Sequence, residues 1–232
     1  MGLVIRRSSC LPLIALSAMG VSAGCGAPPC RLQEAAPVIK ASAAANASVS
    51  PAALPARLFD EPLTWCKFRI MPRTLWDDQM LLHGQPGALD NVRTICVRSV
   101  RSDPAAVSLT ASAAELRRLR DEAVQRGFAD TGCHFYVDRA GGVWAARSLT
   151  LMPAAVPNHN ANMVAIGVLG TSHSGGLTKL QSKKLAALVG ELAEHFNVPA
   201  SKICVPSDIA DAATADAHIG SVLTSVRASR SP

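Results

Sequence analysis

The chain has little of what several large classes of protein need. Aromatic residues make up only 4% of its 232 residues, although hydrophobic residues reach 49%, and much of that excess is alanine. The formal charge is a modest +6, and no run of Lys and Arg is dense enough for a nucleic-acid-binding arm. No cysteines are spaced CxxC, which argues against a zinc ribbon or a thioredoxin-like site. We therefore expect no nucleic-acid partner.

The first residues have the pattern of an export signal. Arg6-Arg7 is positively charged, residues 11–21 are apolar but too short to span a bilayer comfortably, and Ser22-Ala23-Gly24 offers small residues for cleavage. We expect residues 1–24 to be a signal peptide, and the protein to be exported to the periplasm or cell envelope. The small residues before Cys25 also resemble a bacterial lipobox. Cys25 is therefore a candidate lipidation site and membrane anchor point, with ordinary cleavage as the alternative.

Composition divides the rest of the chain into a linker, a domain and a tail. Residues 25–57 are rich in Ala, Pro and Ser, which is typical of a tether. Residues 58–222 alternate between strand and helix patterns, and residues 223–232 form a short C-terminal tail. Strands separated by helices in one domain predict an α/β fold, in which helices flank a mixed central sheet.

The expected elements follow from apolar spacing. Ser112 and Glu115 have the spacing of a helix cap, and Thr178 and Gln181 have the spacing of a capping box. Apolar runs predict strands, and apolar residues at helical spacing predict helices. The strands are expected at 94–97, 133–137, 143–146, 164–169 and 203–205, and the helices at 112–127 and 178–196.

Six segments, in order, resemble the family of zinc-dependent N-acetylmuramoyl-L-alanine amidases and peptidoglycan recognition proteins. They are Pro72 to Trp76, Ile95 to Ser102, Arg126 to Phe135, Val137 to Trp144, Asn162 to Val168 and Leu177 to Gln181. The resemblance covers roughly residues 69–221. It implies one domain of that fold, with peptidoglycan or muropeptide fragments as partners. In active members it also implies a zinc ion held by two histidines and a third Cys, His or Asp.

The residues at the implied ligand positions do not supply three zinc ligands. Arg98 is at the first position and has no lone pair to give, and Pro206 at the second has no side-chain donor. His218, at the third, is the only surviving ligand. Cys133 replaces a tyrosine that assists catalysis, and we expect its neighbour His134 to be a core histidine, since adjacent strand residues point to opposite faces. We therefore predict a domain that binds peptidoglycan fragments without hydrolysing them and without a cofactor.

Two other functions stay open. Cys96 and Cys204 each lie two residues before a lost ligand position, so on extended strands they would share its face. With Cys133 and His218 they form a candidate soft-ligand set, through which an active amidase could use a rearranged zinc site. The alternative is that Cys96 and Cys204 are small buried side chains or form a disulfide. The other function is that of a structural or partner-binding lipoprotein.

Polar residues crowd one loop that borders the ligand groove in the family. We expect their side chains either to hydrogen-bond N-acetyl and peptide groups or to stabilise an Asn-rich turn. Trp144 either stacks on a sugar or packs in the core. The loop residues are Asn158, His159, Asn160 and Asn162.

Overall fold

The computed structural model describes residues 63, 65–77, 87–103, 107–171, 176–209 and 217–230. They belong to one compact unit, Pro51–Pro232. The predicted signal peptide, the linker and Cys25 lie outside the described residues. Within the described ranges, no helix is long and apolar enough to cross a membrane.

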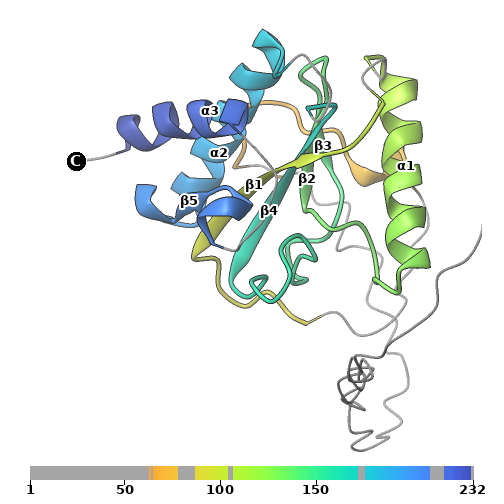
Figure 1. Cartoon of the computed structure of the whole chain (residues 1–232), viewed down its shortest axis with the longest axis horizontal. Helices are drawn as coiled ribbons and strands as arrows, with labels where there is room; N and C mark the ends of the chain where they lie inside the picture. The colour runs from red at the N-terminus through yellow and green to blue at the C-terminus, as the bar shows by residue number, and fades with distance from the viewer. Residues whose placement is uncertain are drawn as a thin grey trace, which may run out of the picture. The chain divides into compact units, whose positions relative to one another are not determined.

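The centre of the domain is a five-stranded mixed sheet, in the order β3-β2-β4-β1-β5 (Figure 1). Four strands run parallel, and only β3 pairs antiparallel, with β2. The mixed sheet confirms the predicted fold class. The strands are β1 (Thr94–Val100), β2 (Phe135–Val137), β3 (Val143–Ala145), β4 (Met163–Leu169) and β5 (Ile203–Cys204).

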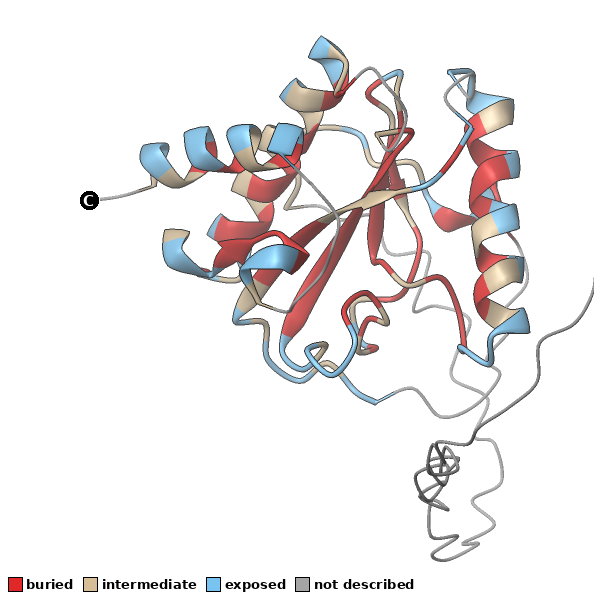
Figure 2. Cartoon of the chain, in the orientation of Figure 1, coloured by how far each residue is buried: buried red, intermediate tan, exposed pale blue. Residues whose placement is uncertain are grey.

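Helices cover both faces of the sheet. The helix α1 (Leu109–Gln125) lies on one face, and α2 (Lys179–His195) and α3 (Ala217–Ser229) lie on the other (Figure 1). Alternate residues of β1 serve the two layers: Ile95 and Val97 pack in the core beneath α2 and α3, and Cys96 packs in the core beneath α1. The strand β4 is buried along its whole length, as expected for a central parallel strand (Figure 2).

The two predicted helix caps had different outcomes. At α2 the capping box is confirmed: Thr178 Oγ1 accepts from the Gln181 backbone N–H (3.0 Å), and Gln181 Oε1 accepts from the Thr178 backbone N–H (3.3 Å). At α1 the predicted cap is wrong, because Ser108 caps the helix four residues earlier. Ser112 instead points inward and donates its hydroxyl proton to the buried carboxylate of Asp138 (2.8 Å).

The chain ends in a third helix where a tail was predicted. The helix α3 (Ala217–Ser229) runs across the predicted boundary at residue 222. Ile219, Leu223 and Val226 are buried, and their spacing of four and three residues gives α3 one apolar face. Gly, Ser, Val and Thr fill the positions between them, which hid this pattern in the sequence.

A buried network of ion pairs joins the first described segment to the rest of the domain. Arg73 Nη1 lies 2.6 Å from Asp130 Oδ2, and Arg73 Nη2 lies 2.7 Å from Asp77 Oδ2. Arg73 also donates to the carbonyl oxygen of Ala146 (2.9 Å), and Arg120 of α1 pairs with Asp77. One guanidinium therefore connects the loops before β2 and after β3, and Asp77 extends the network to α1.

Replacing Asp130 by Ala tests how much this network contributes to stability. The variant leaves the Arg73 charge buried with fewer partners, so we expect the free energy of unfolding in urea to fall by roughly 3 kcal/mol. Lys67→Ala is the control, because its ion pairs with Glu191 and Glu194 lie at the surface, and we expect no measurable change. A loss below about 1 kcal/mol for Asp130→Ala, the usual upper size of an exposed ion pair, would contradict this role.

Candidate ligand-binding groove

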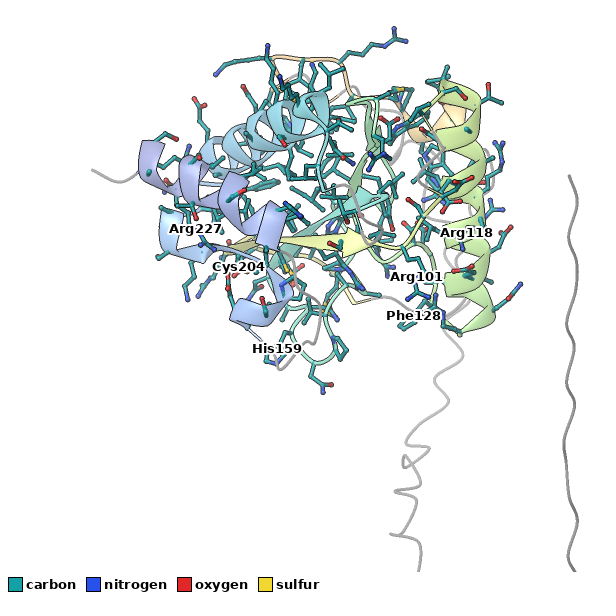
Figure 3. All side chains as sticks on the ribbon, turned by 45° about the horizontal axis from the view of Figure 1, so that its top comes forward. Arg101, Arg118, Phe128, His159, Cys204 and Arg227 are labelled. Carbon is teal, nitrogen blue, oxygen red and sulfur yellow. The ribbon has the colours of Figure 1, made fainter. Side chains whose placement is uncertain are left out.

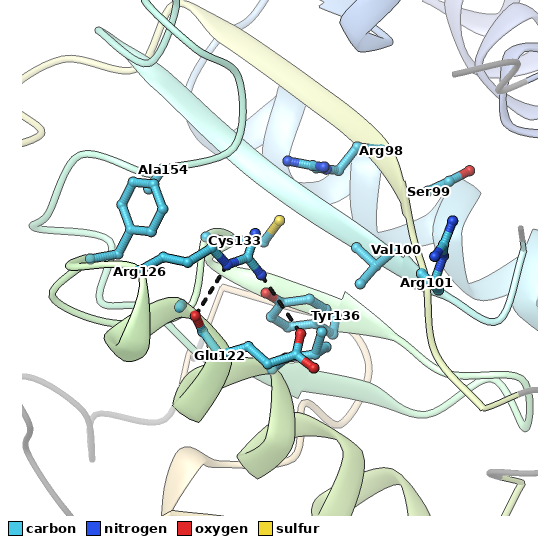
Figure 4. A pocket seen from close by; sticks show the side chains of 13 residues that line it. Arg98, Ser99, Val100, Arg101, Glu122, Arg126, Cys133, Tyr136 and Ala154 are labelled. Atoms are coloured by element: carbon cyan, nitrogen blue, oxygen red, sulfur yellow. Dashed lines mark hydrogen bonds and ion pairs between the residues drawn. The ribbon is translucent and has the colours of Figure 1, made fainter. Parts of the chain in front are cut away.

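Two neighbouring cavities of about 260 and 590 Å³ lie on the α1 side of the sheet. Arg98, Arg126, Phe128 and Ala154 line both cavities, so we describe them together as the groove. Figure 4 shows the smaller cavity, where side chains from β1, from the end of α1 and from the region of Cys133 and Tyr136 at the start of β2 face one another. Pro206, which follows β5, lines the larger cavity together with residues of the loop that precedes β4.

Positive charge dominates the groove. Arg98 Nη1 donates to the carbonyl oxygen of Ala155, and the Nε of Arg98 is buried with no hydrogen-bond partner among the described residues. Arg101 and Arg126 also line the smaller cavity, where Glu122 is the one carboxylate among the lining residues. Glu122 already lies 3.6 Å from Arg126 and also pairs with Arg118. The groove therefore presents guanidinium groups suited to an anionic ligand.

Cys133 and Tyr136 form the inner wall of the smaller cavity. Burial raises the pKa of the Cys133 thiol to about 11, so the thiol is protonated at neutral pH. Burial also raises the pKa of Tyr136 well above its ordinary value, which keeps the phenol neutral. The resemblance implied a tyrosine at the position of Cys133. Tyr136, the chain's single tyrosine, lines the same cavity. The sequence analysis did not identify Tyr136 as a groove residue.

The predicted polar loop lies partly on the groove. Asn158 and Asn160 line the larger cavity. The side-chain oxygen of Asn160 accepts from the backbone N–H groups of Ala155 and Val156 (2.9 Å each), so it also shapes the loop, as the turn alternative proposed. His159 and Asn162 are exposed, and neither lines either cavity.

Trp144 belongs to the core. Its side chain is 0% exposed, and its Nε1 donates to Asp138 Oδ2 (2.8 Å). A fully buried ring offers no face to a sugar. The structure therefore supports the core-packing alternative for Trp144.

His134 is a neutral core residue, as predicted. The backbone N–H of Ala165 donates to its Nδ1 (3.0 Å), so the Nε2 carries the proton and donates to the carbonyl oxygen of Leu151 (2.8 Å). Burial, with a further contribution from the charge of Arg147, lowers the pKa of His134 to about 4. His134 thus ties β4 to the segment between β3 and β4 and takes no part in the groove.

The three implied ligand positions are not brought together around a metal. Arg98 and Pro206 line the larger cavity. His218 is exposed in the first turn of α3. Its imidazole ring lies beside Gly176: a Cβ atom added to that glycine would be 3.1 Å from His218 Nδ1. In the described part of the chain, no three His, Cys, Asp or Glu side chains could hold a metal ion together. Because Arg98 and Pro206 also lack a lone pair to donate, the residues present do not fit a catalytic zinc.

Comparison with known proteins finds relatives of one kind. The sequence profile of N-acetylmuramoyl-L-alanine amidases matches residues 91–218. Bumblebee PGRP-SA superposes with a TM-score of 0.55 at 15% identity, over 62% of this chain and 86% of that one. Drosophila PGRP-LB superposes with a TM-score of 0.53 at 19% identity, over 62% and 85%. A mutant of Drosophila PGRP-LB in complex with tracheal cytotoxin gives 0.52 at 18%, over 60% and 83%. No curated protein matches the sequence.

The buried imidazole of His134 predicts a dependence of stability on pH. In the unfolded chain the imidazole of His134 has its ordinary pKa of 6.5, whereas in the folded protein its pKa is about 4. The free energy of unfolding is therefore unaffected by this group above pH 6.5 and falls as the pH decreases towards 4. At pH 5 the decrease amounts to about 2 kcal/mol. NMR of the ring protons should show His134 neutral at pH 5.5, with the exposed His159 ring as internal comparison. A His134 titration midpoint above pH 6 would contradict this assignment.

Proposed function

Because the chain belongs to the N-acetylmuramoyl-L-alanine amidase family, we propose that its groove binds peptidoglycan fragments and leaves their amide bonds intact. A relative of the same fold has been solved in complex with tracheal cytotoxin, and other relatives are named as peptidoglycan recognition proteins. These names support peptidoglycan or muropeptide fragments as the ligand class. The predicted export signal supports an envelope location, where such fragments are found.

The observation that carries the proposal is the position of Arg98. Its guanidinium stands in the groove where the family resemblance asks for a metal ligand, and its Nε lacks a partner among the described residues. The peptide stems of peptidoglycan carry free carboxylates, and arginine binds a carboxylate through two parallel hydrogen bonds. Asn158, which also lines the larger cavity, supplies an amide suited to N-acetyl and peptide groups.

Binding without hydrolysis follows from what the groove residues can and cannot do. Amide hydrolysis by this family requires a polarised carbonyl and an activated water, both of which a metal provides. Arg98 can donate hydrogen bonds to an oxygen, but it cannot lower the pKa of a water molecule by coordinating it. Cys133 is protonated at neutral pH, and Glu122 is held by Arg118 and Arg126. No group in this set is available as a general base.

The binding test compares Arg98→Ala with Arg93→Ala. Purified protein is sedimented with isolated sacculi and titrated calorimetrically with soluble muropeptides. We expect the unchanged chain to bind, and Arg98→Ala to bind roughly 10- to 100-fold more weakly, since charge-assisted hydrogen bonds contribute about 1.5–3 kcal/mol. Arg93 is exposed just before β1 and lines neither cavity, so Arg93→Ala should bind as the parent does.

Two results would overturn the proposal. If neither sacculi nor muropeptides bind, the fold has been kept for a structural or partner-binding role. If Arg98→Ala binds as tightly as the unchanged chain, the guanidinium is not part of the recognition site.

A further inference from the structure

Two cysteines on neighbouring strands face each other beneath the groove. Cys96 of β1 and Cys204 of β5 are direct partners in the parallel register, and both are buried in the core on the α1 side. Cys204 Sγ lies 3.6 Å from the carbonyl oxygen of Ile95, so its sulfur points towards β1. Paired strands lie about 4.8 Å apart, which is inside the range of roughly 4.4–6.8 Å between the Cα atoms of a disulfide.

We propose that Cys96 and Cys204 form a redox pair that closes a disulfide between β1 and β5. Both are free thiols in this structure. The proposal is independent of the ligand that occupies the groove.

The strand order selects Cys204, and not Cys133, as the partner of Cys96. Cys133 comes just before β2, which pairs with β4 and not with β1. Two strand spacings therefore separate it from β1, roughly 9–10 Å, which exceeds the reach of a disulfide without backbone movement.

Among the described residues, Cys204 is the more accessible thiol of the pair. Cys96 is fully buried, whereas Cys204 lines a cavity of about 470 Å³ together with Lys202, Asp208 and Arg227. Figure 3 shows Cys204 near Arg227, on the side of the molecule away from Phe128. A hydrogen bond from Cys96 lowers the pKa of Cys204, which favours the attacking thiolate at the accessible position.

The exchange balances with glutathione disulfide as the oxidant. The Cys204 thiolate attacks one glutathione sulfur, forming a mixed disulfide and releasing one glutathione thiolate. The sulfur of Cys96 then attacks Cys204 Sγ, releasing the second glutathione thiolate, which takes up the Cys96 proton. The two cysteines lose two electrons, and one disulfide is reduced to two thiols.

The disulfide would link covalently the two strands, β1 and β5, that lead to Arg98 and Pro206 of the groove. Cys96 lies two residues before Arg98, and Cys204 lies two residues before Pro206, and both of these residues line the larger cavity. The strand β5 is at the edge of the sheet and is paired to β1 through only two residue pairs. A covalent link at one of these pairs would fix the distance between the two strands.

Peptide mapping of the full-length chain tests the pair. The protein is reduced, freed of reductant, treated with glutathione disulfide, quenched in acid, unfolded, alkylated and digested with trypsin. Cleavage places Cys96 in peptide 94–98 and Cys204 in peptide 203–227. We expect these two peptides to be recovered linked, with loss of their alkylated forms. Cys133→Ser should leave the link unchanged, and Cys96→Ser should leave Cys204 as a stable adduct with glutathione.

Three outcomes would overturn the pair. Measurements on the unchanged chain alone decide each of them if a variant does not fold: peptide mapping decides the first two, and a zinc assay with thiol alkylation decides the third. The first is that Cys96 and Cys204 both remain alkylated after oxidation. The second is that Cys96 is linked to Cys133 or to any other cysteine. The third is that the reduced chain retains zinc after dialysis and that the zinc shields both thiols, which would make them ligands.

Discussion

The buried charge of Arg73 is the constraint on which the arrangement of this domain most depends. Its guanidinium bonds Asp130 and Ala146, which lie 57 and 73 residues away in the chain. A buried guanidinium is tolerated only when its partners are in place, so the entry segment and the loops on both sides of the β2–β3 hairpin have to be positioned together. Asp130 then fixes the next residue, because its Oδ1 accepts from the backbone N–H of Thr131 (2.7 Å). This fixes the segment that carries Cys133 into the groove.

The domain has the amidase-family fold, and under the proposed function the cation that contacts the ligand is the guanidinium of Arg98. A metal ion polarises a carbonyl and also acidifies a bound water, whereas a guanidinium offers only hydrogen bonds and a fixed charge. Arg98 therefore suits recognition of a carboxylate or carbonyl more than its hydrolysis. Pro206 also lines the cavity, and its ring offers no atom that could coordinate a metal. The inferred Cys96–Cys204 link would stiffen this same part of the molecule.

Local patterns allowed the sheet, α1 and α2 to be predicted from the sequence, because strand and helix periodicities and the Thr178 capping box depend on near neighbours. The start of α1 was misplaced because Ser112 bonds Asp138, a partner distant in the chain. The family motifs singled out Arg98 and Pro206, and the structure places both on one cavity. The contributions of Arg126 and Tyr136 to the groove depend on how the end of α1 meets the hairpin, and the pairing of Cys96 with Cys204 depends on strand order. The groove contributions cannot be read from spacing along the chain. Spacing did offer a Cys96–Cys204 disulfide as one alternative, and the strand order makes the two residues direct neighbours.

The most direct test of recognition without hydrolysis is an assay for amide cleavage in the presence of zinc. Soluble muropeptides are incubated with the purified chain and excess zinc, and newly released amino termini of L-alanine are measured, with an active amidase as the positive control. We predict that the muropeptides are bound but that no new amino termini appear. Release of L-alanine termini that a chelator abolishes would contradict this function, because it would show a working metal site that Arg98, Pro206 and His218 do not supply.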